Sequence, residues 1–197
     1  MIIIIISTLI GLGIFFQIYT SMATGKSAIQ PYSVIRKEKV FEIRYYPSVT
    51  MATITSSAKT YKDLGTPGFR KLAGYIFGGN SSNTKIAMTA PVHMDINDSA
   101  STMGFVMPSE FHKDNLPKPN DSSVKIETTT DEYVATIEFG GFASSEKIAN
   151  YKEQLENALK KDNITYYGRF RFLGYNPPFQ LFGRRNEIIV SVNWEAK

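Results

Sequence analysis

The chain of 197 residues is long enough for one domain of ordinary size, and its balance of 43% hydrophobic and 20% charged residues excludes wholesale disorder. It has no cysteine, which excludes disulfides, thiolate metal sites and a cysteine nucleophile. The net charge is +4, but the Lys and Arg residues are scattered, so we expect no nucleic-acid partner.

The N-terminal residues 1–25 have the pattern of a membrane segment. From Ile2 to Tyr19 the chain is apolar apart from Ser7, Thr8 and Gln17. A helix needs about 20 such residues to cross the hydrocarbon core, so this run is just long enough. We therefore predict a single-span membrane anchor, with a cleaved secretory signal or a buried core helix as the alternatives.

The side of the membrane is a separate question. The first charged residue is Lys26, and the basic residues that follow the run favour a cytoplasmic domain by the positive-inside tendency. A large domain can override that tendency, and a signal-like start usually delivers an extracytoplasmic domain. We expect an extracytoplasmic domain on an anchor, or a secreted or periplasmic protein if the segment is cleaved.

The first half of the remaining chain predicts four strands and one helix. Residues 41–45 alternate with period 2 and residues 50–55 are rich in β-branched side chains, which predicts an antiparallel pair joined by a turn at Pro47. Two more strands are predicted at 85–92 and 102–107. Thr66 and Pro67 predict the start of the helix, and Gly78-Gly79 predicts its end. Its apolar positions are Phe69, Leu72, Ala73, Ile76 and Phe77.

The second half repeats this order. Residues 124–127 and 133–139 predict a second strand pair, and 168–174 and 187–192 two further strands. A helix is predicted to open at Ser144 or Ser145. Its apolar stripe consists of Ile148, Tyr151, Leu155 and Leu159, with Glu156 and Lys160 paired on the wet side.

These elements predict an α+β fold within one domain, residues 26–197. Strand–strand–helix–strand–strand occurs twice, in halves at about 31–107 and 124–194, joined by a proline-containing polar loop at 108–123. Neither half has enough apolar surface for a core of its own. We expect an eight-stranded distorted antiparallel barrel with two helices, and a ligand site in the cleft between the halves.

Three motifs identify a family. They are KIAMTAPV at Lys85–Val92, EFGGF at Glu138–Phe142, and GYNPPF at Gly174–Phe179 followed by GRRNEI at Gly183–Ile188. Together they resemble the SOUL family of haem-binding proteins, over about Tyr32 to Trp194. The resemblance implies the fold shared with the effector-binding domains of gyrase-inhibitor-like proteins. It also implies non-covalent binding of haem or a related tetrapyrrole, for buffering, sequestration or transfer.

A haem groove needs apolar walls and cations for the propionates. The first helix can supply one wall, because Phe69, Leu72 and Phe77 lie on its apolar face, and Arg70 and Lys71 flank that face as candidate cations. The other wall is expected to come from Tyr175, Phe179 and Phe182, in the loop that contains Pro177 and Pro178 and that we call the proline loop. The competing interpretation is that the helix residues are plain core and the two cations a solvated face.

An axial iron ligand is the least determined part of the expected site. Met88 lies in the KIAMTAPV motif and His93 follows it directly, so both are candidates. The alternatives are that Met88 fills the core, that His93 ends a surface strand, and that His112 is solvated in the polar loop. The axial histidine described for animal members has no matching position here, so we expect binding without a histidine ligand.

The sequence is also compatible with two other classes of function. Some gyrase-inhibitor-like relatives are described as hydrolases, and Glu187 with Tyr166, Tyr167 or Tyr175 has the residue types for such a site. The alternative is that Glu187 pairs with Arg184 or Arg185 and only orders the loop. A protein-interaction module is the third class, without a supporting motif. We expect a binding protein and not an enzyme.

Overall fold

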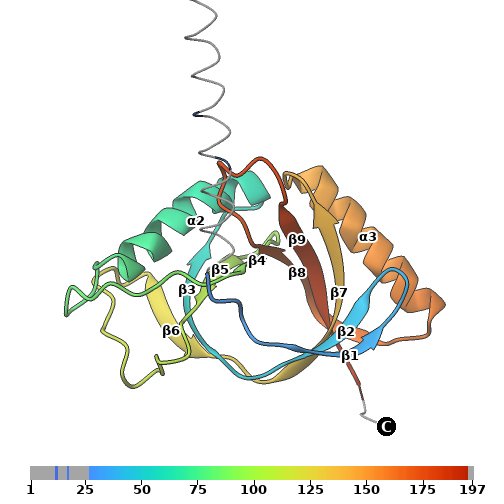
Figure 1. Ribbon diagram of the computed structural model, residues 1–197, viewed down its shortest axis with the longest axis horizontal. Coiled ribbons are helices and arrows are strands. Elements are labelled where there is room, and N and C mark those ends of the chain that lie inside the picture. Colours follow the sequence, from blue (N-terminus) through green and yellow to red (C-terminus); the bar gives the residue numbers. More distant parts are fainter. Residues whose placement is uncertain (1–11, 13–16, 18–26, 195–197) are drawn as a thin grey trace, which may run out of the picture.

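The computed structural model describes residues 27–194 together with Leu12 and Gln17. Over these residues the chain forms one nine-stranded antiparallel sheet and two helices, α2 (Tyr61–Ile76) and α3 (Ser145–Lys161), as shown in Figure 1. The α+β prediction is confirmed. The strands are β1 (Ser33–Lys37), β2 (Glu42–Tyr46), β3 (Thr50–Ser56), β4 (Val92–Asp95), β5 (Ser101–Val106), β6 (Val124–Thr128), β7 (Glu132–Gly140), β8 (Tyr166–Gly174) and β9 (Arg185–Val192).

The order of the strands in the sheet is β1-β2-β7-β9-β8-β4-β5-β3-β6. The ninth strand, β1, is an exposed edge strand that the sequence did not predict. The two antiparallel pairs predicted from neighbouring runs are wrong, because β2 does not pair with β3, nor β6 with β7. Instead β2 pairs with β7 and β3 pairs with β6.

The predicted turn at Pro47 is a bend between two strands that continue each other. Tyr46 lies opposite Glu132, and Thr50 lies opposite Thr128. Between them the Thr129 amide donates to the Val49 carbonyl at 2.9 Å. Residues 42–56 and 124–140 are therefore two long bent ribbons that run side by side. Because they join distant positions in the strand order, the sheet curves back on itself like a distorted barrel (Figure 1).

Helix α2 begins one and a half turns earlier than predicted. The Thr60 side chain accepts from the Asp63 amide and caps the helix, and Pro67 lies inside it. Burial explains the earlier start, because Leu64 is only 1% exposed and packs in the core. The helix ends at Ile76, just before the Gly78 that was predicted to end it.

Helix α3 follows its prediction closely. Ser144 is the N-cap, and its side chain accepts from the Lys147 amide. Leu155 and Leu159 are fully buried, and Glu156 and Lys160 form an ion pair at 2.8 Å on the outer face. The apolar stripe and the helix start were therefore confirmed.

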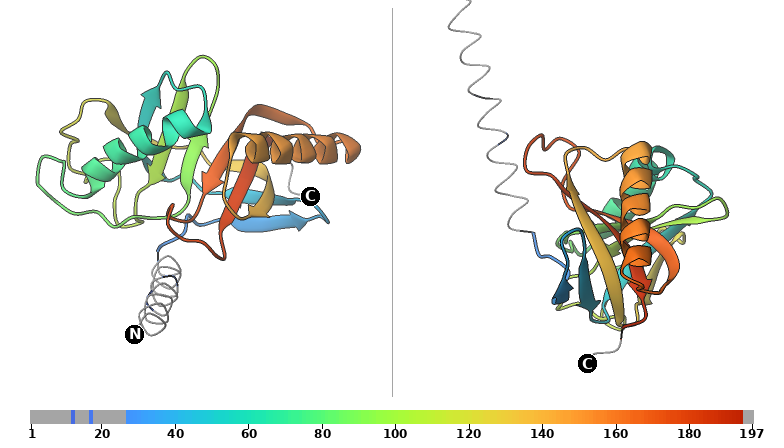
Figure 2. Two further views of the ribbon diagram at one scale, coloured as in Figure 1. Left: turned by 90° about the horizontal axis from the view of Figure 1, so that it is seen from above. Right: turned by 90° about the vertical axis from the view of Figure 1, so that its right-hand side faces the viewer.

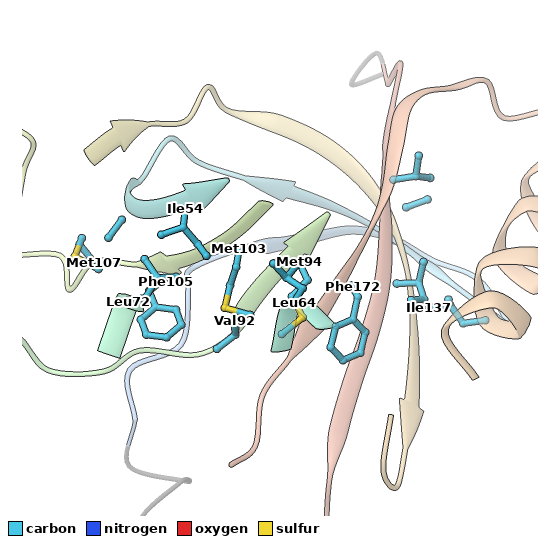
Figure 3. Packing of buried hydrophobic residues seen from close by; sticks show 14 of the residues in the cluster. Ile54, Leu64, Leu72, Val92, Met94, Met103, Phe105, Met107, Ile137 and Phe172 are labelled. Carbon is cyan, nitrogen blue, oxygen red and sulfur yellow. The ribbon is translucent and has the colours of Figure 1, made fainter. Parts of the chain in front are cut away.

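Both helices pack on one face of the sheet and close the main core over it (Figures 1 and 3). In Figure 3, Leu72 of α2 lies beside Phe105 of β5, and Phe172 of β8 lies between the two halves of the core. The opposite face carries a second, smaller cluster of Tyr46, Ala90, Val134, Leu173, Tyr175 and Ile189. Strand alternation separates the two sets, as Ile188 and Ile189 of β9 show by facing opposite sides.

The segment predicted as a strand at 85–92 is irregular up to Pro91, and regular pairing begins only at Val92. Its polar groups are still used. The Thr89 hydroxyl donates to the Val106 carbonyl at 2.6 Å, and the Ala90 backbone bonds to Ala28 and Gln30. The KIAMTAPV motif therefore fastens the N-terminal part of the domain to the end of β5.

The membrane segment predicted at residues 1–25 lies outside the described residues, apart from Leu12 and Gln17. Among the residues that the structure describes, no helix has both the length and the apolar character needed to span a membrane.

Candidate functional site

A groove of about 300 Å³ lies along the outer face of α2, and we call it the α2 groove. Four of its lining residues come from the last two turns of the helix, and the loops after α2 and before β6 complete it. The lining residues are Arg70, Lys71, Gly74, Tyr75, Gly79, Asn120 and Asp121. Of the predicted site residues, it brings together Arg70 and Lys71.

The floor of the groove is a glycine that packing does not explain. Gly74 is exposed inside α2, and a Cβ built on it would meet nothing within 4 Å. A glycine at such a position costs a helix about 1 kcal/mol relative to alanine. Gly79 differs, because its Cβ would lie 2.6 Å from the Gly74 carbonyl oxygen. The open backbone at Gly74 gives a flat apolar ring a place for close approach.

The charges of the α2 groove suit an acidic ligand on one side only. Arg70 and Lys71 are exposed and lie one turn before Gly74 on the helix. Lys71 Nζ donates to Ser123 Oγ at 3.1 Å. On the opposite wall, hydrogen bonds from Ser123 lower the pKa of Asp121, which stays ionised. A carboxylate ligand would therefore be directed towards Arg70 and away from Asp121.

A second hollow, of about 390 Å³, contains Met88. Its other lining residues are Ser27, Ala28, Ala87, Pro108, Ser109 and Glu110. It is the larger of the two, but none of the described residues that line it is basic, and Glu110 would repel a propionate. The α2 groove fits the carboxylates of a tetrapyrrole better.

The aromatic and aliphatic residues predicted as the helix wall are divided between core and surface. Leu72 is fully buried, and Phe69 packs on Phe105 with ring centroids 5.2 Å apart, so both fill the main core. Phe77 is 61% exposed just beyond the end of α2. These three residues do not form a common wall.

The proline loop lies at the other end of α2. Its Arg184 lies close enough to Tyr61, in the first turn of α2, for the two side chains to interact electrostatically. Phe179 and Phe182 are exposed on this loop, at 52% and 71%. Tyr175 is buried on the face of the sheet opposite the helices. The structure therefore places the two predicted walls apart.

His93 also lies on the sheet face opposite the helices, beside Leu173 of β8. Its Nε2 lies 2.7 Å from Oε1 of Gln30, an oxygen that can only accept, so Nε2 carries the proton. Burial, and secondarily the Arg171 guanidinium, lowers the pKa of His93 to about 3. The ring is neutral at ordinary pH and is separated from the α2 groove by the sheet.

The same sheet face holds a buried ionic cluster around Glu187. Its Oε1 accepts from Arg44 at 2.9 Å and from Arg185 at 2.6 Å, and its Oε2 accepts from Tyr175 at 2.8 Å. Glu187 is fully buried and Arg44 is 3% exposed. We call Arg44, Tyr175, Arg185 and Glu187 the ionic cluster.

The electrostatics of this cluster favour a structural role. Burial alone would lower the pKa of Arg44, but the Glu187 carboxylate outweighs it and raises that pKa. Burial and the same carboxylate raise the pKa of Tyr175 well above its usual value. A fully buried carboxylate between two guanidiniums is an ion-pair partner and not an accessible general base. Of the three candidate tyrosines only Tyr175 bonds to Glu187, while Tyr166 donates to Glu156.

Of the two arginines predicted as partners of Glu187, the structure selects Arg185. Arg184 instead binds the carbonyl oxygens of the proline loop. Sequence reasoning missed Arg44, because the alternation of residues 41–45 assigns it to the polar side of the strand, which is expected to face solvent. Gly74 carried a signal, a glycine inside a predicted helix, that could have marked the groove. Among the described residues, no group of three or more His, Asp or Glu side chains is placed to hold a metal ion.

Comparisons with known proteins agree with this fold. The chain is 34% identical over 157 residues to heme-binding protein 2 of Mus musculus, covering 75% of this chain and 76% of that protein. The EcmrR C-terminal domain superposes with a TM-score of 0.62 at 10% identity, over 83% of this chain and 99% of that one. A hydrolase from Listeria innocua gives 0.56 at 9% identity, over 82% and 94%.

At such low sequence identity, the likeness to the two solved structures shows the fold alone. The comparison of sequences also identifies the family. The family model described as SOUL heme-binding protein matches residues 28–191, nearly all of the described domain. The chain therefore belongs to the SOUL heme-binding protein family.

Proposed function

We propose that this protein binds haem or a related tetrapyrrole non-covalently in the α2 groove and serves to buffer, sequester or transfer it. The observation that carries the proposal is the combination of an open helix backbone at Gly74 with Arg70 and Lys71 one turn away. Membership of the SOUL family supports the class of ligand. The lining of the α2 groove supports the location of the binding site.

The residues of the groove fit a tetrapyrrole in two respects. A planar ring can lie against the helix backbone at Gly74, where no side chain intervenes. Its propionates can reach Arg70 and Lys71, whose charge-assisted hydrogen bonds to carboxylates are the strong kind. An axial protein ligand is not part of this site. Tyr75 is 2% exposed and donates to the Pro117 carbonyl, and the described lining residues include no histidine or methionine.

The test is a haemin titration of the full-length protein in detergent micelles, followed at the Soret band. Arg70→Ala combined with Lys71→Ala is expected to weaken haemin binding about tenfold, equivalent to about 1.4 kcal/mol. Binding of the dimethyl ester of the same porphyrin, which lacks free propionates, is expected to change little.

The matched control removes two exposed lysines elsewhere, by Lys39→Ala combined with Lys113→Ala. This control changes the net charge equally, so it corrects for long-range attraction. Equal weakening by both double variants, or equal loss for haemin and its ester, would show that the α2 groove does not hold the propionates. A titration of the unmodified protein that never saturates would contradict haem binding itself.

For the location of the protein, we propose that residues 1–25 anchor it to a membrane with the domain outside the cytoplasm. The uncharged run from Ile2 to Tyr19 supports an anchor. Free haem is itself largely apolar and partitions into lipid, so an anchored domain would stay near its ligand. Carbonate extraction of membranes tests the anchor: the protein is expected in the pellet, and its release as a soluble protein would contradict the proposal.

A further inference from the structure

The loop between β8 and β9, residues 175–184, is the proline loop and stands out from the body of the domain (Figure 2). It presents Leu181 and Phe182 to the outside, at 51% and 71% exposure. The neighbouring Phe142 is 50% exposed and lies under the Arg184 guanidinium, with its ring centroid 4.4 Å from Arg184 Cζ. Large apolar side chains gathered at one exposed tip mark an interaction surface.

Several backbone carbonyl groups of this tip accept hydrogen bonds from side chains of the chain itself. Arg184 Nη1 donates to the carbonyl oxygens of Pro177 and Gln180, each at 2.7 Å. The Gln180 side chain, which is 3% exposed, donates to the Phe182 carbonyl at 2.8 Å. Two successive prolines, at 177 and 178, remove two backbone donors altogether. The carbonyl oxygens of residues 177, 180 and 182 therefore have partners within the chain, whereas Gln180 Oε1 and Arg184 Nε are buried without one among the described residues.

Gln17, from the N-terminal segment, also forms hydrogen bonds with the backbone of the loop tip. Gln17 Oε1 accepts from the Leu181 amide at 3.0 Å, and Gln17 Nε2 donates to the Phe179 carbonyl at 3.2 Å. Gln17 lies near the end of the uncharged run from Ile2 to Tyr19. The loop tip is thus bonded to a residue near the C-terminal end of the uncharged run.

From this arrangement we infer that the tip of the proline loop, with Leu181 and Phe182 at its front, inserts into the surface of a lipid bilayer. Hydrocarbon favours a loop whose backbone groups are bonded internally, and the bonds of Arg184, Gln180 and Gln17 provide this for part of the loop. The contact with Gln17, near the end of the uncharged run, favours a lipid surface over a protein partner. The inference rests on the membrane anchor proposed for residues 1–25 and is independent of haem binding.

Tryptophan fluorescence in vesicles tests the inference with the full-length protein. The single native tryptophan is replaced by Trp194→Phe, and Phe182→Trp places a new one at the loop tip. The matched control is Phe77→Trp in the same background, because Phe77 is 61% exposed but follows the opposite end of α2, a helix about 24 Å long. The proteins are reconstituted in phosphatidylcholine vesicles with and without brominated acyl chains.

Brominated acyl chains are expected to quench tryptophan at position 182 at least twofold more than at position 77. Aqueous iodide is expected to show the reverse order. Quenching at position 182 by iodide alone would show a loop in water and overturn the inference. Protection from both quenchers would show that protein covers the tip and would overturn it equally. If Phe182→Trp reconstitutes poorly, Leu181→Trp gives the same measurement.

The test separates this inference from the anchor on which it rests. Failure of all variants to associate with vesicles would contradict the anchor and with it the inserted loop. Association without acyl-chain quenching at position 182 would contradict the inserted loop alone.

Discussion

Arg44 on β2 and Glu187 on β9 form a buried ion pair with 2.9 Å between Nη1 and Oε1, across the strand β7 that separates them in the sheet. The two residues are 143 positions apart in the chain. Tyr32 stacks on the Arg44 guanidinium with its ring centroid 4.3 Å from Cζ, which covers the charge from the outside. This pair ties a strand of the first half of the sequence to the last strand of the second.

We expect Glu187→Gln to lower the free energy of unfolding by about 3 kcal/mol, because it removes the fully buried counter-charge of Arg44 and leaves that guanidinium only its pair with the less buried Glu42, at 2.8 Å. Urea denaturation at pH 7 measures the change. Glu138→Gln is the control, since Glu138 lies opposite Glu187 on β7 and also pairs with Arg185, but its side chain is 57% exposed. A cost as small as that of Glu138→Gln would show that the buried pair contributes little.

Gly74→Ala separates helix stability from ligand binding. The added methyl group meets no other part of the domain, so we expect the substitution to raise the free energy of unfolding by about 0.5–1 kcal/mol. It should also weaken haemin binding, because it lifts a ring off the helix backbone. Gly65→Ala is the control within the same helix, with equally open space and no contact with the groove. Unchanged haemin affinity in Gly74→Ala would place the ring elsewhere.

His93→Ala and Met88→Ala are both expected to leave the Soret maximum of the haem complex unchanged. His93 lies on the sheet face opposite α2, and Met88 lines the other hollow, so neither side chain reaches the α2 groove. Absorption spectra of the ferric and ferrous complexes measure this. A shifted maximum in either variant would identify that residue as an axial ligand and move the binding site to its face of the domain.

Stability in mild acid should depend on His93. An unfolded histidine binds a proton near pH 6.5, whereas burial lowers the pKa of the folded His93 to about 3. Between these values the unfolded state holds more protons, so the free energy of unfolding falls as the pH is lowered from 6.5 towards 3. In His93→Gln this fall is expected to be shallower, by urea denaturation at intervals between pH 7 and 4.

His112→Gln, which removes an exposed histidine from the polar loop, is the control for that series. If His93→Gln and the unmodified protein lose stability in parallel, the imidazole accepts its proton in the folded state and is not held neutral by its surroundings.

The sequence predicted the elements better than their partners. The start of α3 at Ser144 and its stripe through Leu155 and Leu159 follow from local rules of capping and periodicity, which depend on neighbours in the chain. The predicted start of α2 at Thr66 and Pro67 is too late. Proline is common in the first turn of a helix, which made Pro67 a plausible start, but the burial of Leu64 extends the helix one and a half turns before it.

The pairing of β2 with β7 and of β3 with β6 was decided only by the tertiary structure. Alternating apolar residues determine which face of a strand is removed from water, but they do not identify the strand beside it. For the same reason the sequence could not identify Glu187, the buried partner of Arg44 on a distant strand. The family, the elements and the candidate cations follow from the order of residues, while strand partners and buried ion pairs depend on how distant segments are brought together around a common core.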